Sequence, residues 1–391
     1  ESGWAMTDAQ RERDYRIIRD MGCTAVRMAH YQHCDHEYSL CDRLGLCVWT
    51  EIGIINKMSA DESDAHVLSD GFGDNAKQQL RELIRQNYNH PSVIVWGLSN
   101  ELHQMTDEIF GLYSELYEIA CKEDDTRLKT FADNQFYGRF LELPADVVGY
   151  NRYFGWYKEA GSAENFGEWL DLYHNEKEKR PVCLSEYGGG GAISQHKDNV
   201  DWESDIDPVG VRHYENYQSQ LHEILWKQFS VRKYLWAEFI WCMFDFASYG
   251  RTEGDTKSLN DKGLCTRERI PKDVYFFYRS VWSSEKTVYI TERRHEFRAC
   301  DVPFVKVYSN ADAVELCIND VSHGRISRCE LPNDESTVFV WENIKIKPDT
   351  KNKICAKAYF SDRTSRTDYA FWTGKYCLLY TSPSPRDLST S

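Results

Sequence analysis

The chain has 391 residues, which is enough for two or three domains with a sizeable core. Hydrophobic residues at 41% and aromatic residues at 14% describe a folded globular protein, and this aromatic content suits a site that stacks sugar rings. Aspartate and glutamate outnumber lysine and arginine by 62 to 47, so the net charge of -15 argues against nucleic acid as a partner.

Cysteine usage and hydropathy exclude several further classes of protein. The thirteen cysteines include no CxxC pair and no short secreted pattern, so we expect neither a disulfide scaffold nor a zinc site. No apolar run approaches membrane-spanning length, and the first residues do not read as a signal peptide. Because the chain begins with Glu1 instead of Met, we expect the natural start to be missing, and the compartment and any homo-oligomer stay open.

The first part of the chain alternates helices with short strands. Thr7 precedes an amphipathic run that stops at Gly22, and a second helix stops at Gly45. The strands that follow these helices end at His30 and Glu51. The predicted elements are a helix over 8–20, a strand over 24–30, a helix over 38–44 and a strand over 46–51.

The same alternation continues through the middle of the chain. Further helices are predicted over 74–87, 107–123, 163–178 and 211–229. Further strands are predicted over 93–101, 128–133, 147–153, 182–188 and 237–245. Seven strands separated by helical connections indicate a parallel sheet, which is either a closed barrel or an open doubly wound sheet.

Polar residues at the strand ends favour the barrel. At least five of the seven strands end in His, Glu, Asn or Tyr, as expected when all strand ends converge on one mouth. A barrel of this kind has eight strands, and no strand precedes Thr7. We therefore predict an α/β fold, a (β/α)8 TIM barrel over 1–290 that lacks its first strand.

Past Trp282 the pattern changes to alternating strands joined by short polar turns. These strands are predicted over 302–310, 313–320, 337–346, 353–360 and 366–374. We expect a small all-β, immunoglobulin-like sandwich over 291–374 that acts as a spacer or docking domain. The Ser- and Pro-rich tail, 375–391, is expected to be disordered, and because it resembles a translated sequencing adapter we expect it to be foreign to the natural protein.

Two carboxylates carry the chemistry. Glu101 ends the apolar strand PSVIVWGLSNE, and Glu186 ends another strand in VCLSEYGGGG. Two such groups at one barrel mouth are the minimum equipment for cleaving a glycosidic bond, because one protonates the departing oxygen while the other attacks the anomeric carbon. A separation of about 5 to 5.5 Å would give retention of configuration, and mutual repulsion would raise the pKa of the acid.

Several motifs strengthen this interpretation. In chain order they read VRMAHY, CDRLGL, NHPSVIVWGLSNE, GYNRYFGWY, LSEYG, WCMFDFAS and NDKGLCTRER. Together they resemble glycoside hydrolase family 2, the β-galactosidase and β-glucuronidase group, over Gly3–Trp282. The resemblance implies an exo-acting retaining glycosidase that needs no cofactor and acts on carbohydrate. It also implies a sugar-binding sandwich and an immunoglobulin-like domain before the barrel, so we expect little activity from residues 1–391 alone.

The resemblance also assigns roles to the two carboxylates and to one neighbour. Glu101 matches the general acid/base of the family, and Glu186 matches its nucleophile. Asn100, directly before the acid/base, matches the residue that binds the sugar 2-hydroxyl.

Three further residues match positions around the sugar. Tyr153 corresponds to a tyrosine that donates to the nucleophile, and His30 corresponds to a histidine lining the subsite. Trp241 corresponds to an aromatic platform under the sugar. A core or supporting role is the alternative for each of these three residues.

A departure from the family pattern concerns metal. In magnesium-dependent members a Glu and a His follow the third strand, and the matching positions here are Ile55 and Lys57. Because Ile offers no ligand and Lys repels a cation, we expect no metal at the acid/base. His33 and His36 are expected to be solvated loop histidines instead of a metal pair.

The sugar is the least determined feature. Asn260 and Lys262 in NDKG match a pattern that glucuronidases use to hold a uronic acid carboxylate. The surrounding sequence resembles the galactosidase branch more closely, so we expect a β-galactosidase, with a β-glucuronidase as the alternative. A non-catalytic carbohydrate-binding protein on a degenerate barrel is a third possibility, and the presence of Asn100 and both carboxylates argues against it.

Overall fold

A computed structural model of the chain describes residues 5–55, 71–135, 137–332 and 337–375. These residues form two compact units. The first consists of Glu1–Gly190, Leu221–Arg251 and Ser258–Arg269, and the second consists of Gly191–Gln220, Thr252–Lys257 and Ile270–Ser391. The tail predicted over 375–391 lies outside the described residues, apart from Lys375.

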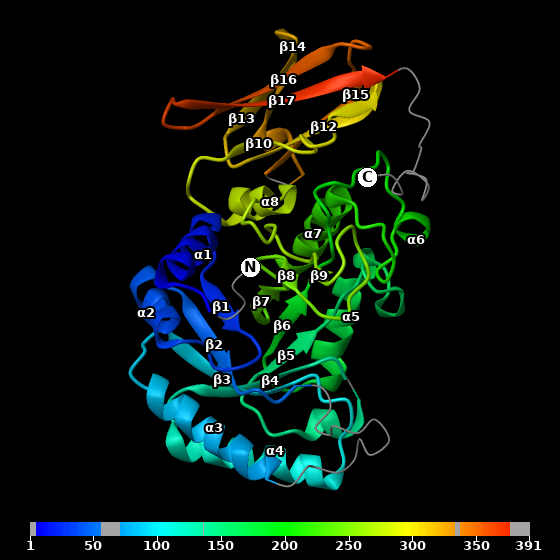
Figure 1. Cartoon of the computed structure of the whole chain (residues 1–391). Helices are drawn as coiled ribbons and strands as arrows, with labels where there is room; N and C mark the ends of the chain where they lie inside the picture. The colour runs from blue at the N-terminus through cyan, green and yellow to red at the C-terminus, as the bar shows by residue number, and fades with distance from the viewer. Residues whose placement is uncertain (1–4, 56–70, 136, 333–336, 376–391) are drawn as a thin grey trace. The chain divides into compact units, whose positions relative to one another are not determined.

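Seven parallel strands form the centre of the first unit and curve into a nearly closed barrel (Figure 1). They are β1 (Ala25–Met28), β2 (Cys47–Glu51), β3 (Val93–Asn100), β4 (Leu128–Asp133), β5 (Val148–Asn151), β6 (Val182–Tyr187) and β7 (Leu235–Ile240). Each strand pairs with the next one along the chain, and every pair is parallel. The predicted barrel class and its seven strands are therefore confirmed.

Helices cover the outside of this sheet. They are α1 (Asp8–Met21), α2 (Asp35–Leu44), α3 (Phe72–Asn87), α4 (Asp107–Glu123), α5 (Phe166–Leu172) and, in part, α7 (Glu215–Phe229). The first of them shows why the predicted ends are correct. The hydroxyl of Thr7 accepts from the backbone N–H of Gln10, whose side chain accepts from the N–H of Thr7, and Gly22 ends the helix with φ 99°.

Short elements complete the first unit. Single turns lie at Gly138–Glu142, Lys158–Ala160, Ala163–Asn165 and Tyr173–Lys177, and the two-stranded hairpin β8 (Phe246–Ala247) and β9 (Leu259–Asn260) follows the barrel strands. With α5, the turns at Ala163–Asn165 and Tyr173–Lys177 form one uninterrupted helical segment, so the helix predicted over 163–178 is present, with a tighter first turn and a wider last turn.

A buried tryptophan and a glycine fix the packing inside the barrel. Trp49 on β2 is buried with Val95, Ala132 and Cys183 from three other strands. A Cβ at Gly97 would lie 2.4 Å from Trp49 Nε1 and 2.6 Å from the Cβ of Glu51, so position 97 accepts no side chain. The bare backbone of β3 leaves room for a large ring and a carboxylate side by side in the barrel interior.

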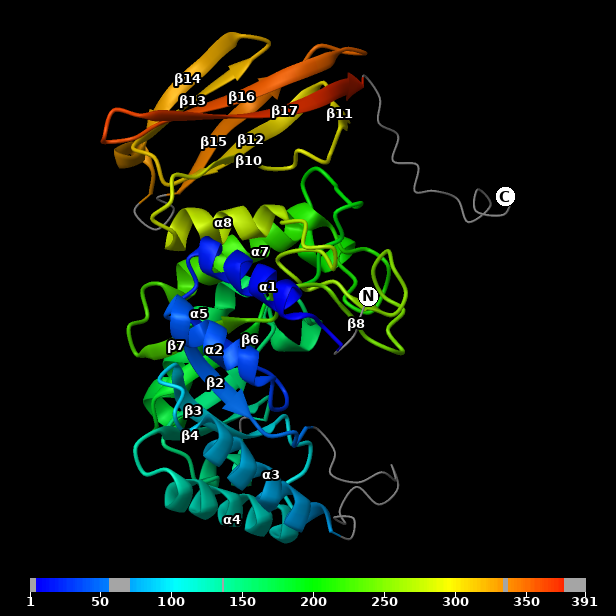
Figure 2. The ribbon, with the colours of Figure 1, turned by 60° about the vertical axis from the view of Figure 1, so that its left-hand side comes forward.

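Two antiparallel sheets form the sandwich of the second unit (Figure 2). The smaller sheet has the order β10 (Val288–Ile290), β12 (Asp301–Ser309), β15 (Val338–Lys345). The larger has the order β11 (Phe297–Ala299), β17 (Ser365–Lys375), β16 (Lys351–Tyr359), β13 (Ala313–Ile318), β14 (Val321–Ser327), with β11 parallel to β17. Between them lies an apolar core that includes Val305, Phe339, Ile354 and Trp372.

Helices accompany this sandwich. The second unit contains α6 (Trp202–Asp205), α8 (Asp273–Trp282) and a single turn at Arg328–Glu330, and α8 packs against β12. The predicted sandwich strands are present, whereas α8, β10, β11 and β14 were not predicted. No described helix combines the length and apolarity needed to cross a bilayer.

Candidate active site

Glu101 lies directly after β3 and is held by an asparagine from β5. Asn151 Nδ2 donates to Glu101 Oε1 at 2.9 Å, and Ser185 Oγ in turn donates to Asn151 Oδ1 at 2.7 Å. Burial, and secondly the charge of Glu186, raise the pKa of the Glu101 carboxyl above its ordinary value. A raised pKa keeps a proton available, which is the property a general acid needs.

Glu186 ends β6 and is bonded through both of its oxygens. Tyr153 OH donates to Oε2 at 2.6 Å, and Arg27 NH1 donates to Oε1 at 2.7 Å. Two donors on a carboxylate fix its orientation. Burial, followed by the charge of Glu186, raises the pKa of the Tyr153 hydroxyl well above its ordinary value, so this phenol stays a donor.

Arg27, from β1, joins the two sides of the barrel mouth. Its side chain is 3% exposed, and it donates to Glu51 at 2.9 and 3.1 Å as well as to Glu186. A fourth bond reaches Asn100 Oδ1 at 2.7 Å, which fixes the amide directly before Glu101. Burial alone would lower the pKa of this guanidinium, but the two carboxylates outweigh burial and raise it.

His30 and Trp241 lie together beside Glu186. His30 Nδ1 is 3.0 Å from Glu51 Oε1, and its Nε2 is 4.0 Å from Glu186 Oε1. The ring of Trp241 stacks on the histidine with centroids 5.0 Å apart and an interplanar angle of 21°. The structure therefore brings both predicted subsite residues to the carboxylates.

Asp133, at the end of β4, is a further buried acid near Glu101. Its Oδ1 accepts from the backbone N–H of Gln135 at 2.8 Å, while its buried Oδ2 has no hydrogen-bond partner among the described residues. Burial raises the pKa of this carboxyl to about 8; backbone donors oppose the rise and the charge of Glu101 adds to it. At neutral pH it is thus a neutral acid.

Asn260 and Lys262 lie next to Tyr153 and are both buried. Asn260 Oδ1 accepts from the backbone N–H of Lys262 at 3.1 Å. Lys262 Nζ donates to Tyr157 OH at 3.1 Å and lies 5.8 and 5.7 Å from the ring centres of Tyr153 and Trp156. A buried ammonium among aromatic rings is a strong attractor for an anionic group on a bound molecule.

The metal predictions have mixed outcomes. Ile55 forms a β-bridge with Asn100 and offers no ligand, while Lys57 lies outside the described residues. The loop predicted for His33 is present, and this partly exposed residue has its Nε2 3.0 Å from the carbonyl of Ala29. The loop predicted for His36 is wrong, because α2 begins at Asp35 and places His36 on the helix, 3.8 Å from Glu12.

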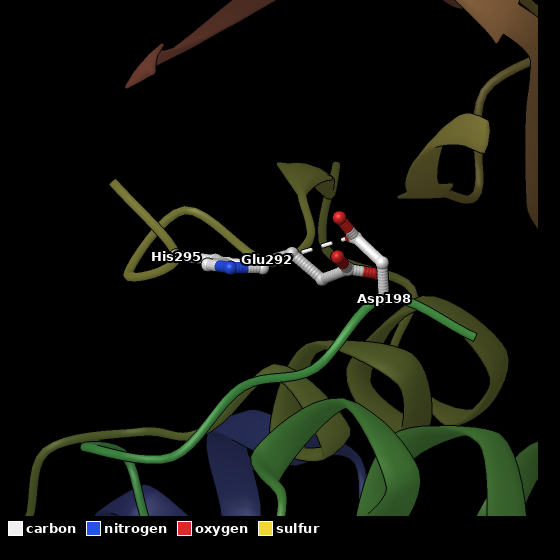
Figure 3. Close-up of side chains that lie close together, drawn as sticks. All are labelled: Asp198, Glu292 and His295. Atoms are coloured by element: carbon white, nitrogen blue, oxygen red, sulfur yellow. Dashed lines mark ion pairs between the residues drawn. The ribbon is translucent and has the colours of Figure 1, made fainter. Parts of the chain in front are cut away.

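In the second unit, three side chains with metal-ligating atoms come together (Figure 3). Ligand atoms of Asp198, Glu292 and His295 all lie within 4.8 Å of one another. Arg298 donates to the first carboxylate at 2.5 Å and to the second at 2.8 Å, so each carboxylate already has a cationic partner. Burial, and secondly Arg298, lower the pKa of His295 to about 4. We assign this cluster to an ion-pair network and no metal to it.

Comparison with known proteins places the barrel in a family. A model described as the TIM barrel domain of glycosyl hydrolases family 2 matches residues 1–287. The chain belongs to glycoside hydrolase family 2. A second model, a domain of unknown function, matches residues 302–364 within the sandwich.

Curated family 2 relatives are longer than this chain. A β-glucuronidase of Bacteroides fragilis is 36% identical over 349 residues, which are 88% of this chain and 48% of the relative. A putative β-glucuronidase of Formosa agariphila is 31% identical over 82% of this chain and 40% of the relative. The chain thus spans about half the length of the first relative and less than half the length of the second.

Solved family 2 structures cover the chain more completely. The FMN-binding β-glucuronidase of Faecalibacterium prausnitzii has a TM-score of 0.82 at 33% identity and covers 95% of this chain and 54% of its own. A putative β-galactosidase of Bacteroides fragilis has a TM-score of 0.84 at 31% identity, with coverage of 95% and 52%. Three of these four relatives carry the name β-glucuronidase and one carries the name β-galactosidase, so the names support a family 2 β-glycosidase.

Four polar residues of this family 2 site were not assigned a role from the sequence. Arg27 stands three residues before His30 in VRMAHY, and Glu51 was recognised only as a strand end. Asn151 and Asp133 end the two strands that follow β3. The available signal was position, since all four lie at or near the carboxyl ends of barrel strands.

Proposed function

We propose that the protein containing this chain is a retaining β-glucuronidase that releases terminal β-linked glucuronic acid. One observation carries the choice of sugar. The ammonium of Lys262 is buried among Tyr153, Trp156 and Tyr157, next to the hydroxyl that bonds Glu186. A uronate carboxylate can form an ion pair with this ammonium, whereas the neutral 6-hydroxyl of a galactoside cannot.

In the first step Glu186 attacks the anomeric carbon while Glu101 gives its proton to the departing glycosidic oxygen. The bond to the leaving group breaks as a glycosyl ester forms on Glu186. The raised pKa of Glu101 supports its role as the acid, and the donors on Glu186 from Arg27 and Tyr153 support its role as the nucleophile.

In the second step Glu101, now ionised, takes a proton from water as that water attacks the same carbon. Glucuronic acid leaves, and Glu186 and the protonated Glu101 are regenerated. Asn100, whose amide is fixed by Arg27 and Asn151, is suited to bind the 2-hydroxyl during both steps.

The test compares p-nitrophenyl β-glucuronide with p-nitrophenyl β-galactoside in the full-length protein. We expect preference for the glucuronide, and in Lys262→Gln a loss of about 100-fold or more in kcat/KM for that substrate, because a substrate charge loses its buried partner. Lys122→Gln, an exposed lysine on α4, is the matched control. Preference for the galactoside would restore the alternative, and turnover of neither substrate by the intact protein would support a non-catalytic binding protein.

A further inference from the structure

The larger sheet of the sandwich has one face outside the core, which we call the outer face. On β16 and β17 the buried core residues include Ile354, Ala356, Ala370 and Trp372. Because side chains alternate along a strand, the residues between them point to the other side of the sheet. The register places Lys353 opposite Phe371 and Cys355 opposite Tyr369 on this outer face.

Three aromatic rings on the outer face are open to solvent. Phe297, Tyr369 and Phe371 are 55%, 50% and 45% exposed. They are neighbours, since Phe297 pairs with Thr373, two residues beyond Phe371, and Tyr369 lies two residues before it. Exposed rings side by side on one sheet are costly in water and mark a surface that another molecule covers.

Cations accompany these rings. The outer-face positions carry the basic residues Arg325, Lys351, Lys353, Lys357 and Lys375 and the single acidic residue Glu315. Two of these cations have carboxylate partners in adjoining turns, Lys353 with Asp320 at 2.5 Å and Lys375 with Asp349 at 2.9 Å. Five cations therefore face three carboxylates, and this excess of positive charge contrasts with the chain as a whole, whose net charge is -15.

The positive groups lie beside the rings. Lys351 Nζ is 4.7 Å from the ring centre of Phe371, and Lys353 Nζ is 6.0 Å from that of Tyr369. Glu315 accepts from the hydroxyls of Ser322 and Tyr359 at 2.7 and 2.9 Å, so the carboxylate is occupied locally. The combination offers flat apolar surface and positive charge within one side-chain length of each other.

We propose that the outer face binds an acidic polysaccharide. The C–H face of a sugar ring stacks on Tyr369, Phe371 or Phe297, and its carboxylate reaches a neighbouring lysine. The positive charge of the outer face favours an anionic chain as the ligand, and the exposed rings favour sugars as the units of that chain. The choice of a uronate over other acidic sugars rests on the proposed glucuronidase function. No catalytic step is assigned to this face.

Affinity electrophoresis tests the proposal with full-length protein in gels containing polygalacturonate, dextran or polyglutamate. The Glu186→Gln background removes turnover, so retardation reports binding alone. We expect retardation in polygalacturonate, weakened about tenfold or more by Tyr369→Ala with Phe371→Ala. The double variant Lys353→Gln with Lys357→Gln should bind more weakly, and its binding should depend less on salt. This lysine variant still tests the proposal if the aromatic double variant unfolds the sandwich. Tyr249→Ala and Lys345→Gln, both exposed and outside the larger sheet, are matched controls.

Each outcome decides the proposal. Retardation in polygalacturonate that depends on the rings and the lysines supports it. No retardation in polygalacturonate, equal retardation in dextran, or equal retardation in polyglutamate without any effect of the aromatic pair would each overturn it. A wild-type protein that binds polygalacturonate but fails to hydrolyse a glucuronide would overturn only the proposed function.

Discussion

Arg27 in the barrel and Lys357 on the sandwich carry the same charge in opposite settings. Arg27 is 3% exposed and shared between Glu51, Glu186 and Asn100, whereas Lys357 is exposed and lies 5.2 Å from the ring of Tyr359. Breaking a buried pair typically costs about 3–5 kcal/mol, while an exposed pair contributes about 0–1 kcal/mol. Substituting a buried charge in the barrel should therefore affect both stability and activity, whereas substituting an exposed charge on the sandwich should affect binding alone.

Removing the proposed nucleophile gives the largest expected effect on the barrel side. Glu186→Ala should lower kcat on p-nitrophenyl β-glucuronide about 10⁴-fold, since no covalent intermediate can form. Added azide should restore part of the turnover and give a glycosyl azide of inverted configuration, which product analysis by NMR detects. Glu118→Ala, exposed on α4, is the control, and near-normal kcat in Glu186→Ala would refute the assignment.

Removing the shared guanidinium tests whether the buried charges depend on one another. Arg27→Met leaves Glu51 and Glu186 unpaired, so urea unfolding should show a loss of about 3–5 kcal/mol. Arg27→Met with Glu51→Gln should regain part of that stability without regaining kcat. The exposed pair Arg85–Glu123 provides the comparison, because Arg85→Met should cost less than about 1 kcal/mol. Equal losses at both arginines would remove the contrast between buried and exposed charge.

Asp133 offers a test by pH. With a pKa of about 8 in the folded protein against 3.8 ordinarily, the folded state holds a proton that the unfolded state releases, so stability falls as pH rises through that window. Asp133→Asn should be about 5 kcal/mol more stable than the unaltered protein at pH 8 and equal to it near pH 4. Asp301→Asn, an exposed residue, should show no such dependence. A constant difference across pH would contradict the buried neutral acid.

The hydrogen bond from Asn151 makes a smaller difference to the acid/base. This bond favours the ionised form of Glu101, so Asn151→Ala should raise the Glu101 pKa further and move the basic limb of the kcat/KM profile to higher pH. The loss in kcat/KM should be about tenfold. A basic limb that moves to lower pH would show that the limb does not report Glu101.

A substitution on the outer face of the sandwich should have the smallest effect on stability. Lys357→Gln should change the free energy of unfolding by less than about 0.5 kcal/mol, because the side chain is exposed. Thermal unfolding at low and high salt measures this value. A loss above about 2 kcal/mol would mean that the outer face is structural, contrary to the contrast drawn from Arg27.

Regular patterns made much of the barrel predictable. Thr7 and Gly22 mark the first helix, and apolar runs that end in polar residues mark the strands, so their order could be read from the sequence. β14 was missed because its residues are mostly exposed and show no apolar alternation. The helix predicted over 163–178 is present over 163–177, but its continuous pattern did not indicate that its first turn is tighter and its last turn wider than an α-helix.

The site residues also divide into those that a local pattern indicated and those that it did not. The motifs identified Glu101 and Glu186 because each is a lone carboxylate at a strand end. Arg27 and Asn151 could not be assigned from spacing, since their partners stand 159 and 50 residues away in the chain. Contacts at such separations depend on the closure of the sheet, which no local pattern encodes.

Because Arg27 pairs with both Glu51 and Glu186, it sets the net charge of the group that a bound sugar would contact. One guanidinium offsets one of two carboxylates, so the group keeps a single negative charge while Glu101 holds its proton. In the proposed mechanism that excess stabilises the positive ring carbon as the glycosidic bond breaks, and it passes to Glu101, which has given up its proton, once Glu186 becomes an ester. A protonated cyclic amine of sugar shape should therefore bind the free enzyme more tightly than a neutral ring of the same shape, because only the cation meets that negative charge.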